Sequence, residues 1–401
     1  MEKMTPIQAY AKSIDSNYCL MIDKNGFLQP YDISQQMILS WDYLHTHSRL
    51  REDVEPFKAY LKRKLAVCAN TVFAPTKPEY VSFHQTQFLN TYKSYVPKTD
   101  NKECEPFHEL MSRMFPVDSE RKTVTQFIAH ALRHPEKRPT YGLLFTGLGG
   151  TGKGTLYHSV LSPLLVKQVA PANSFEQVLG KHSELFNGTL CVLLDDIKSG
   201  NANTYIKLKS VMTEPTITIN PKYLKQKTVK VYSRIIFNSN EELPLPIATD
   251  DRRWFATQPM QHTISKEETT EFIRTFKAWI EAKDNSNLDA VYNYLMSVDL
   301  TDFDAYQCQQ TPTLLAMMQQ STPTLELVLQ DYIDNNPLFS WTELTLHLSR
   351  QRLLPATTVL KAALKTLGYR SARILKRTHT IWMPTNYNEN LITSWPLPVS
   401  F

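Results

Sequence analysis

The chain has 401 residues and a formal net charge of +5, with 42% hydrophobic and 21% charged residues. This composition is typical of a folded globular protein of two or three domains. No run approaches the ~18 consecutive apolar residues of a membrane span, and the first residues lack the apolar core of a secretion signal. The five cysteines are scattered, which argues against a zinc site or a disulfide framework and favours a reducing compartment, the cytoplasm (the host cytoplasm for a viral protein).

In chain order, residues 1–104 are expected to form a small, mostly helical accessory region. Residues 105–285 alternate helices with short buried strands, which indicates an α/β domain built on a parallel sheet. Residues 286–323 are predicted as a helical segment and a linker rich in Thr, Gln and Pro, and 324–401 as a small domain of helices followed by a strand pair. Within 105–285 we expect helices at 107–115, 119–133, 153–165 and 265–282, strands at 141–146, 189–194 and 234–237, and a hairpin from 216–220 and 229–232.

The first strong functional signal is a concentration of glycine. Of 11 glycines in the chain, six lie between residues 142 and 154. Residues 147–155 fit G-x-x-x-x-G-K after a buried strand and before a helix, which is the context that a phosphate-binding loop requires. The glycines turn backbone N–H groups toward a phosphate, and the helix N-terminus favours negative charge. We therefore expect nucleotide binding by Gly147, Gly149, Gly150, Thr151, Gly152, Lys153, Gly154 and Thr155.

Gly154 stands where a hydroxyl residue is common, so the hydroxyl that approaches Mg²⁺ is expected to come from Thr155. The ending G-K-G-T also resembles nucleoside monophosphate kinases, which keeps a nucleotide kinase as an alternative.

A second buried strand ends in Asp195 and Asp196. Parallel strands deliver such residues to the sheet edge beside the phosphate loop. Asp195 is expected to hold Mg²⁺, and Asp196 to orient or deprotonate the attacking water.

The third strand is followed by Asn240, which can bond the γ-phosphate or the water, although an asparagine that closes a strand with a turn is common. Next come Arg252 and Arg253. They are either a surface charge patch or a finger presented to a neighbouring subunit's nucleotide, since a guanidinium suits γ-phosphate charge.

In this order and spacing, residues 147–155, 190–196, 233–240 and 250–255 resemble a superfamily 3 helicase of the AAA+ class. The likeness is strongest to the helicase halves of phage, plasmid and poxvirus-type primase-helicases, and it covers about residues 105–260. It implies a homo-hexamer or similar ring around DNA, with ATP and Mg²⁺ bound between subunits. For single residues it implies ATP and Mg²⁺ binding by Lys153 and Thr155, metal and water roles for Asp195 and Asp196, a sensor role for Asn240, and a trans-acting finger at Arg252 with Arg253 as its substitute. No convincing pair of catalytic carboxylates occurs in residues 1–100, so nucleotide polymerisation is not expected.

Residues 198–234 carry eight basic side chains and one acid, Glu214. The tip of the predicted hairpin lies in this segment, and in the resembled family a hairpin at this place projects into the ring pore. Lysines attract backbone phosphates and a tyrosine can stack on a base, although a solvated hairpin is the ordinary explanation for an isolated sequence. The expected DNA-binding residues are Lys222, Tyr223, Lys225 and Lys227.

A second basic segment lies between residues 350 and 379, with eight basic residues and no acid. A capped helix start at 340–343, a helix at 355–367 ended by Gly368, and a strand pair within 370–383 outline a winged helix. Its recognition helix would bury Val359, Leu360, Ala363, Leu364 and Leu367 and leave Thr357, Thr358, Lys361 and Lys365 for DNA. A protein–protein contact and a pore-gating lid remain alternatives.

Together these features predict an ATP-dependent replicative DNA helicase of a phage or other mobile element. It is expected to act as a ring on single-stranded or forked DNA, with a primase or polymerase as a candidate partner and no membrane. The alternatives are an ATP-switched origin-binding initiator, a nucleotide kinase, and a packaging or partition motor on duplex DNA.

Overall fold

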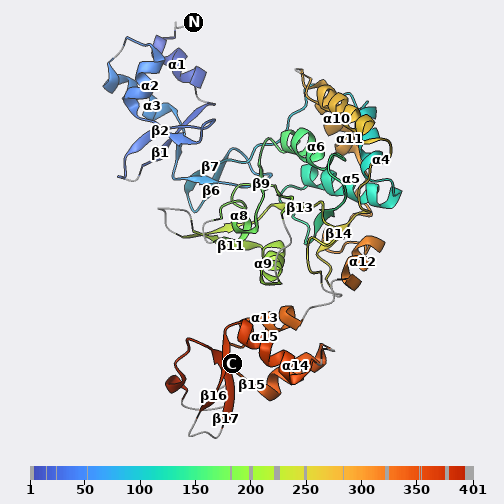
Figure 1. Cartoon of the computed structure of the whole chain (residues 1–401). Helices are drawn as coiled ribbons and strands as arrows, with labels where there is room; N and C mark the ends of the chain where they lie inside the picture. Colours follow the sequence, from blue (N-terminus) through green and yellow to red (C-terminus); the bar gives the residue numbers. More distant parts are fainter. Residues whose placement is uncertain are drawn as a thin grey trace. The chain divides into compact units, whose positions relative to one another are not determined.

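The structure is a computed structural model, and it divides the chain into two compact units, Met1–Ser94 and Tyr95–Phe401 (Figure 1). None of the described helices is both long and apolar enough to cross a membrane. All five cysteines are buried and unbridged. The described residues are 4–14, 16–23, 25–51, 53–180, 183–197, 202–220, 226–247, 251–282, 284–320, 325–351, 353, 355–374 and 379–392.

The first unit mixes helices and sheets. One sheet has the strand order β3-β2-β1-β4 and another the order β5-β7-β6. The expectation of a mostly helical region is therefore wrong. The strands are only two to five residues long, so they leave little periodicity in the sequence. The elements are α1 (Pro6–Ile14), β1 (Tyr18–Ile22), β2 (Leu28–Asp32), β3 (Met37–Ile38), α2 (Trp41–Ser48), α3 (Val54–Lys64), β4 (Val67–Cys68), β5 (Thr71–Val72), β6 (Tyr80–Phe83) and β7 (Thr86–Asn90).

The unit boundary falls before the predicted position, 104. Segment 95–101 belongs to the second unit because it is hydrogen-bonded to α11 (Ser286–Ser297). The buried Asp289 carboxylate accepts hydrogen bonds from the Tyr95 hydroxyl at 2.6 Å and from the Lys98 N–H at 2.8 Å.

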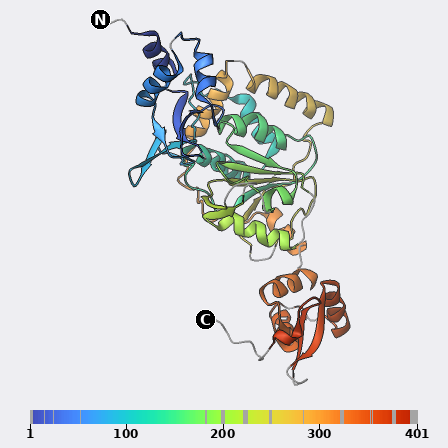
Figure 2. The same ribbon diagram turned by 90° about the vertical axis from the view of Figure 1, so that its left-hand side faces the viewer.

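The second unit is built on a five-stranded parallel sheet with the order β14-β8-β13-β10-β9. Helices cover both faces, as an α/β fold requires, so the predicted α/β class with a parallel sheet is confirmed (Figure 2). The strands are β8 (Gly142–Phe145), β9 (Val169–Ala172), β10 (Cys191–Asp195), β13 (Arg234–Asn238) and β14 (Trp254–Ala256).

The predicted helices are present in this unit as α4 (Glu105–Met114), α5 (Asp118–Arg133), the continuous helical segment α6–η1–α7 (Lys153–Thr155, Leu156–Leu161, Ser162–Leu164) and α10 (Lys266–Ile280). Three further helices pack on one face of the sheet around Val192, Phe237 and Trp254. These are α8 (Phe175–Leu179), α9 (Ala202–Thr213) and α12 (Pro312–Gln320).

Part of the linker that was predicted within 286–323 is a helix instead, α12. Its Leu314, Met317 and Met318 join the core of the sheet domain. The chain leading to it runs along the edge strand β14, where the Thr311 hydroxyl donates to the Ala256 carbonyl oxygen at 2.5 Å. Because the segment is mostly polar, its three apolar residues gave only a weak helix signal in the sequence. Three apolar residues at helical spacing are nevertheless enough to bury one face of a short helix.

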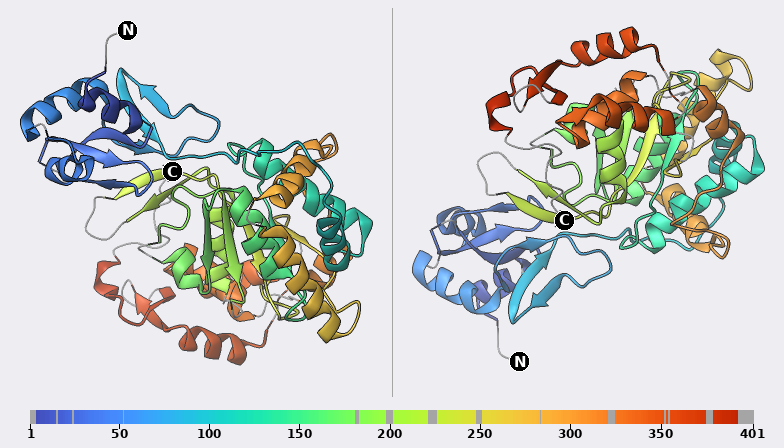
Figure 3. Two further views of the ribbon diagram at one scale, coloured as in Figure 1. Left: turned by 90° about the horizontal axis from the view of Figure 1, so that it is seen from above. Right: turned by 90° about the horizontal axis from the view of Figure 1, so that it is seen from below.

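The C-terminal part has its own core, formed by residues such as Leu329, Leu344, Leu360 and Trp382. Three helices pack on one face of a three-stranded antiparallel sheet with the order β15-β17-β16 (Figure 3). The elements are α13 (Leu325–Asn335), β15 (Phe339–Ser340), α14 (Trp341–Arg350), α15 (Thr357–Thr366), β16 (Tyr369–Ile374), β17 (His379–Pro384) and η2 (Glu389–Leu391).

Two local predictions in this part have opposite outcomes. Ser340 and Glu343 form the predicted reciprocal cap of α14. Val359, expected in the core, is 53% exposed. Leu360 and Leu364 point inward from α15, and Val359 lies about 100° from Leu360 around the helix axis.

Candidate nucleotide site and nucleic-acid surfaces

The candidate phosphate loop, called the phosphate loop below, connects β8 to α6 with the predicted glycine-dependent backbone. Gly147, Gly150 and Gly152 have φ values of +118°, +80° and +107°. Lys153 folds back over the loop, and its Nζ donates to the carbonyl oxygens of Gly147 at 2.7 Å and Leu148 at 2.8 Å. Burial lowers the pKa of Lys153, and the carboxylates of Asp196 and Asp195 partly offset that effect. A phosphate would replace these carbonyl contacts with a stronger, charged acceptor.

The segment after β14 fixes the start of the loop. Met260 donates its N–H to the Thr146 carbonyl oxygen at 2.8 Å and accepts from the Leu148 N–H at 2.9 Å. A Cβ added to Gly147 would stand 2.2 Å from the Met260 carbonyl oxygen. Only glycine fits here, because φ is positive and the neighbouring backbone is in the way.

We therefore expect Gly147→Ala to lower the free energy of unfolding by about 2 kcal/mol or more. Gly149→Ala is the matched control, because a Cβ at Gly149 meets nothing within 4 Å. Urea unfolding of both variants checks this, and equal stability of the two would contradict the assigned close approach.

The carboxylates lie at the same sheet edge as the loop. β10 and β13 are paired so that Asp195 stands opposite Asn238, whose Nδ2 donates to the Asp195 carboxylate at 3.3 Å. Lys153 Nζ also donates to the Asn240 amide oxygen at 3.1 Å, and Asn240 Nδ2 donates to the Asp196 carboxylate at 3.2 Å. The structure thus brings Lys153, Asn240 and Asp196 into one hydrogen-bonded chain, because β13 lies between β8 and β10.

The fit of this edge to Mg²⁺ rests on its oxygen donors. Asp195 and Asp196 offer carboxylates, and Thr155 is buried at the end of α6. Within the described residues, no group of three or more His, Cys, Asp or Glu side chains is arranged to hold a metal. Mg²⁺ commonly binds through one or two carboxylates plus substrate phosphates, so these residues fit a metal that arrives with a nucleotide.

Polar atoms without a partner gather near the same edge. The Thr146 hydroxyl, the Asn238 amide oxygen and the Tyr157 hydroxyl are buried and make no hydrogen bond in the described part of the chain. Burial raises the pKa of Tyr157, and the charges of Cys191 and Asp195 raise it further. Tyr157 is not among the site residues predicted from the sequence, since a tyrosine in a helix carries no site signal.

The two arginines lie at the opposite end of the parallel strands from the loop. They precede β14, which runs parallel to β8, and the Gly142 N–H donates to the Arg253 carbonyl oxygen at 2.9 Å. The length of β8 separates this end of the strands from the loop by roughly 13 Å. Neither guanidinium is therefore beside the phosphate loop of its own chain.

The arginines also differ from each other. Arg253 pairs with the buried Asp251 carboxylate at 3.4 Å, and Asp251 also accepts from the Tyr205 hydroxyl at 2.5 Å. The Arg252 side chain is exposed and makes no ion pair or side-chain hydrogen bond to any described residue. Of the two, Arg252 is the guanidinium presented to the surroundings.

The predicted basic hairpin is present as β11 (Thr216–Ile219) and β12 (Lys227–Lys230). Lys227 is exposed on β12. Arg234, counted with the basic segment, is 1% exposed and donates to the carbonyl oxygens of His134 at 2.9 Å and Lys137 at 2.8 Å. It is therefore a structural residue of β13 and not a DNA contact. The predicted DNA-binding residues Lys222, Tyr223 and Lys225 lie outside the described residues.

On α15, Thr357, Thr358, Lys361 and Lys365 are exposed as expected. Lys361 Nζ lies 5.6 Å from the ring centre of Trp341. Helix α15 thus presents hydroxyl and ammonium groups, and the Trp341 ring beside Lys361 comes from α14.

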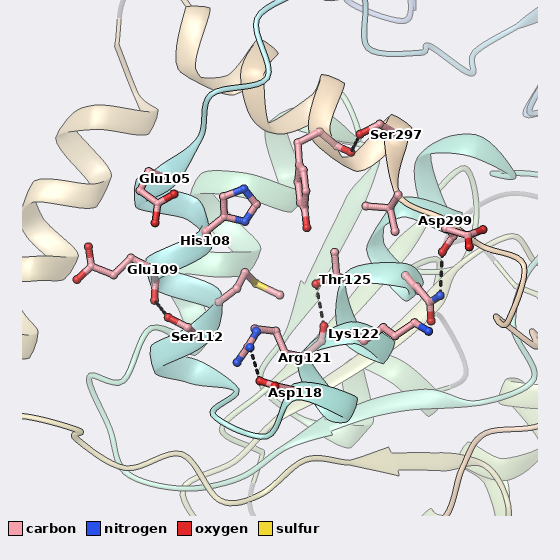
Figure 4. A pocket seen from close by; sticks show the side chains of 14 residues that line it. Glu105, His108, Glu109, Ser112, Asp118, Arg121, Lys122, Thr125, Ser297 and Asp299 are labelled. Atoms are coloured by element: carbon pink, nitrogen blue, oxygen red, sulfur yellow. Dashed lines mark hydrogen bonds and ion pairs between the residues drawn. The ribbon is translucent and has the colours of Figure 1, made fainter.

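A cavity of about 650 Å³ lies between α4, α5 and α11 (Figure 4). Helix α4 directs His108 and Ser112 toward it, whereas Leu110 and Met114 of the same helix lie near Gly152 of the phosphate loop. Several charges at its lining are already paired, as in the ion pair between Arg121 and Asp118. The nucleotide site and this cavity therefore lie on different faces of α4.

Residues 145–253 match DUF5906, a family of unknown function. This interval begins at the last residue of β8 and ends at Arg253, so it contains the loop, both carboxylates, the hairpin and Asn240. Over 194 residues the chain is 27% identical to the DNA primase-polymerase of Nitratiruptor phage NrS-1. The chain is homologous to a phage DNA primase-polymerase. The alignment covers 45% of this chain and 26% of that protein, so the chain matches about a quarter of its relative's length.

Solved structures of the NrS-1 C-terminal region have a similar fold. The apo structure of residues 305–718 has a TM-score of 0.60 at 15% identity and covers 95% of this chain and 99% of that one. An A form apo structure of the same region has a TM-score of 0.60 at 14% identity, with 95% and 100% covered. The similarity to the NrS-1 region therefore extends over nearly the whole chain.

Proposed function

We propose that this chain is the ATP-dependent helicase part of a phage or mobile-element replication protein, with a AAA+ core of the superfamily 3 type. The observation that carries the proposal is the hydrogen-bonded chain from Lys153 through Asn240 to Asp196. It joins the residue that would hold the β- and γ-phosphates to a carboxylate that would act on the attacking water. Homology to a phage primase-polymerase supports a role in replication.

Mg²⁺ would be held by Asp195 and Thr155 together with the nucleotide's phosphates, and it would neutralise charge on the transferred phosphoryl group. Asn238 keeps the Asp195 carboxylate in place by hydrogen bonding. Asp196, exposed and bonded to Asn240, is positioned to orient a water molecule.

A ring is the assembly that best explains the position of Arg252. Arg252 is exposed at the far end of the strands from its own loop, so it can stabilise γ-phosphate charge only on another subunit. We propose a hexamer or similar ring with the nucleotide between subunits.

DNA would be held by the β11–β12 hairpin and by the C-terminal part. The order α13-β15-α14-α15-β16-β17 fits a winged helix with α15 as its recognition helix and the β16–β17 pair as its wing. An origin-binding initiator is the alternative that this part favours, because such a domain recognises duplex DNA.

We expect Lys227→Ala to spare basal ATP hydrolysis and to weaken its stimulation by single-stranded DNA, because Lys227 is on the hairpin and not at the loop. Each lost phosphate contact lowers the salt dependence of binding by about one unit per subunit, and a ring loses one contact in every subunit. Lys277→Ala, an exposed lysine of α10, is the control. The measurement is DNA affinity at two salt concentrations; an unchanged salt slope for Lys227→Ala would remove this residue from the DNA path.

One experiment separates the candidate functions. The ATPase rate is measured with and without single-stranded DNA, and native mass is recorded on the same sample. A ring helicase gives DNA-stimulated hydrolysis in an oligomer. A nucleotide kinase transfers phosphate to a nucleotide acceptor and does not respond to DNA, and an initiator binds duplex DNA without unwinding forks.

A further inference from the structure

His262 lies directly beside the phosphate loop, in the segment that joins β14 to α10. Its Cε1 atom is 3.8 Å from the position that a Cβ on Gly150 would occupy. Met260, two residues earlier, is hydrogen-bonded to both sides of Gly147. The chain segment that carries His262 is therefore held beside the loop by backbone hydrogen bonds.

One nitrogen of the His262 ring has no hydrogen-bond partner among the described residues. Nδ1 is buried and makes no hydrogen bond in the described part of the chain. Nδ1 is bonded to Cε1, the ring atom nearest Gly150, so it lies close to the loop. A buried polar atom without a partner is unfavourable and is rare in folded proteins, which points to a ligand as its partner.

The order of the strands also predicts the orientation of a nucleotide in the site. Lys153, Asn240 and Asp196 place the γ-phosphate end toward β13 and β10. β14 lies on the other side of β8 in the sheet, and residues 257–262 follow it. A nucleotide whose β-phosphate occupies the loop would therefore direct its α-phosphate and nucleoside toward His262.

We propose that His262 is a nucleotide-binding residue whose imidazole donates a hydrogen bond to a phosphate oxygen on the nucleoside side of the loop. Neutral imidazole carries one N–H donor, which is sufficient for this contact. The inference rests on the proposed nucleotide site. It also gives α10 a link to the nucleotide, since Ser265 begins the cap of α10 three residues after His262 and Ile273 of α10 lies near Gly152.

The chain offers a matched control in His158. Its Cδ2 atom is 3.8 Å from the Cβ position of another loop glycine, Gly154, but its side chain is exposed on the helical segment after the loop. A nonspecific effect of removing an imidazole near the loop would appear in both His158→Ala and His262→Ala.

The experiment titrates a fluorescent ADP analogue against the full chain, its His262→Ala, His262→Asn and His158→Ala variants, and Lys153→Ala. We expect His262→Ala to weaken ADP binding about tenfold, the loss typical of one hydrogen bond to a charged group. His262→Asn should recover part of that loss because an amide can donate, and His158→Ala should bind as the wild type does. Thermal unfolding confirms that each variant is folded.

A second measurement is independent of affinity. The Cε1–H NMR signal of His262 should shift on addition of ADP in the wild type, and the shift should be absent in Lys153→Ala. Wild-type ADP binding with an unmoved His262 signal and an unchanged affinity of His262→Ala would overturn the inference alone. Failure of the wild type to bind ADP would overturn the proposed nucleotide site together with it.

Discussion

Lys153→Ala is expected to lower ATP turnover at least about 100-fold, which is the scale of losing one preorganised charged donor at a reacting phosphate. The structure gives the reason. Lys153 is the ammonium within the loop, and through Asn240 it is connected to Asp196. Removing it leaves the transferred phosphate without this cation.

The fold should survive this change. The Nζ contacts of Lys153 are to two loop carbonyl oxygens and one amide oxygen, and no carboxylate loses a direct ion pair. Burial disfavours the charged side chain, so its removal costs little stability. Turnover assays and thermal unfolding test this, with Lys277→Ala as the control; near-wild-type turnover in a folded Lys153→Ala protein would refute the phosphate-loop assignment.

Arg252→Ala is expected to lower ATP turnover about 1,000-fold or more, the range seen for arginines that act on a neighbour's nucleotide. Nucleotide binding to the loop of the same chain should be little changed, because Arg252 lies at the opposite end of the strands. Native mass should still report an oligomer.

Mixing variants identifies the trans arrangement. An Arg252→Ala subunit supplies an intact loop and a Lys153→Ala subunit supplies an intact arginine, so some interfaces in a mixed ring regain both. Recovery of activity on mixing is the expected result, and strictly additive loss would show that the residues do not act across an interface.

Arg253→Ala is the control for this experiment and should behave differently. It removes the guanidinium that pairs with Asp251, whose side chain is 1% exposed. Leaving that carboxylate buried without its cation should lower the free energy of unfolding by roughly 1–3 kcal/mol. A stability loss in Arg253→Ala without one in Arg252→Ala would separate the structural arginine from the proposed catalytic one.

Local patterns in the sequence were sufficient for the elements that surround the proposed nucleotide site. Gly147, Gly150 and Gly152 adopt positive φ values that other residues avoid. The apolar runs that end at Phe145 and Asp195 form buried parallel strands, as their lack of alternation indicates. The reciprocal cap at Ser340 and Glu343 lies within four residues. Each of these signals acts over a short stretch of chain, so neighbouring residues alone determine it.

Elements with weak local signals were missed. β9 contains Pro171, which a central strand does not tolerate, but β9 is the edge strand of the sheet. Helix α12 follows a polar segment, and only contact with the sheet core shows that its three apolar residues are buried. The N-terminal sheets depend on pairings such as β1 with β4, which are far apart in the sequence.

The sequence by itself determined which chemical groups stand at the ends of the strands, because residue spacing and strand pattern are local properties. Only the tertiary structure decided which of them meet. The insertion of β13 between β8 and β10 placed Asn240 between Lys153 and Asp196. Asp251, which accepts a hydrogen bond from Tyr205, paired with Arg253, and Arg252 remained exposed. Met260 packed on Gly147 and so brought His262 to the loop. These contacts join residues from separate elements, and the physical reason is that strand order and packing, unlike secondary structure, depend on the whole chain at once.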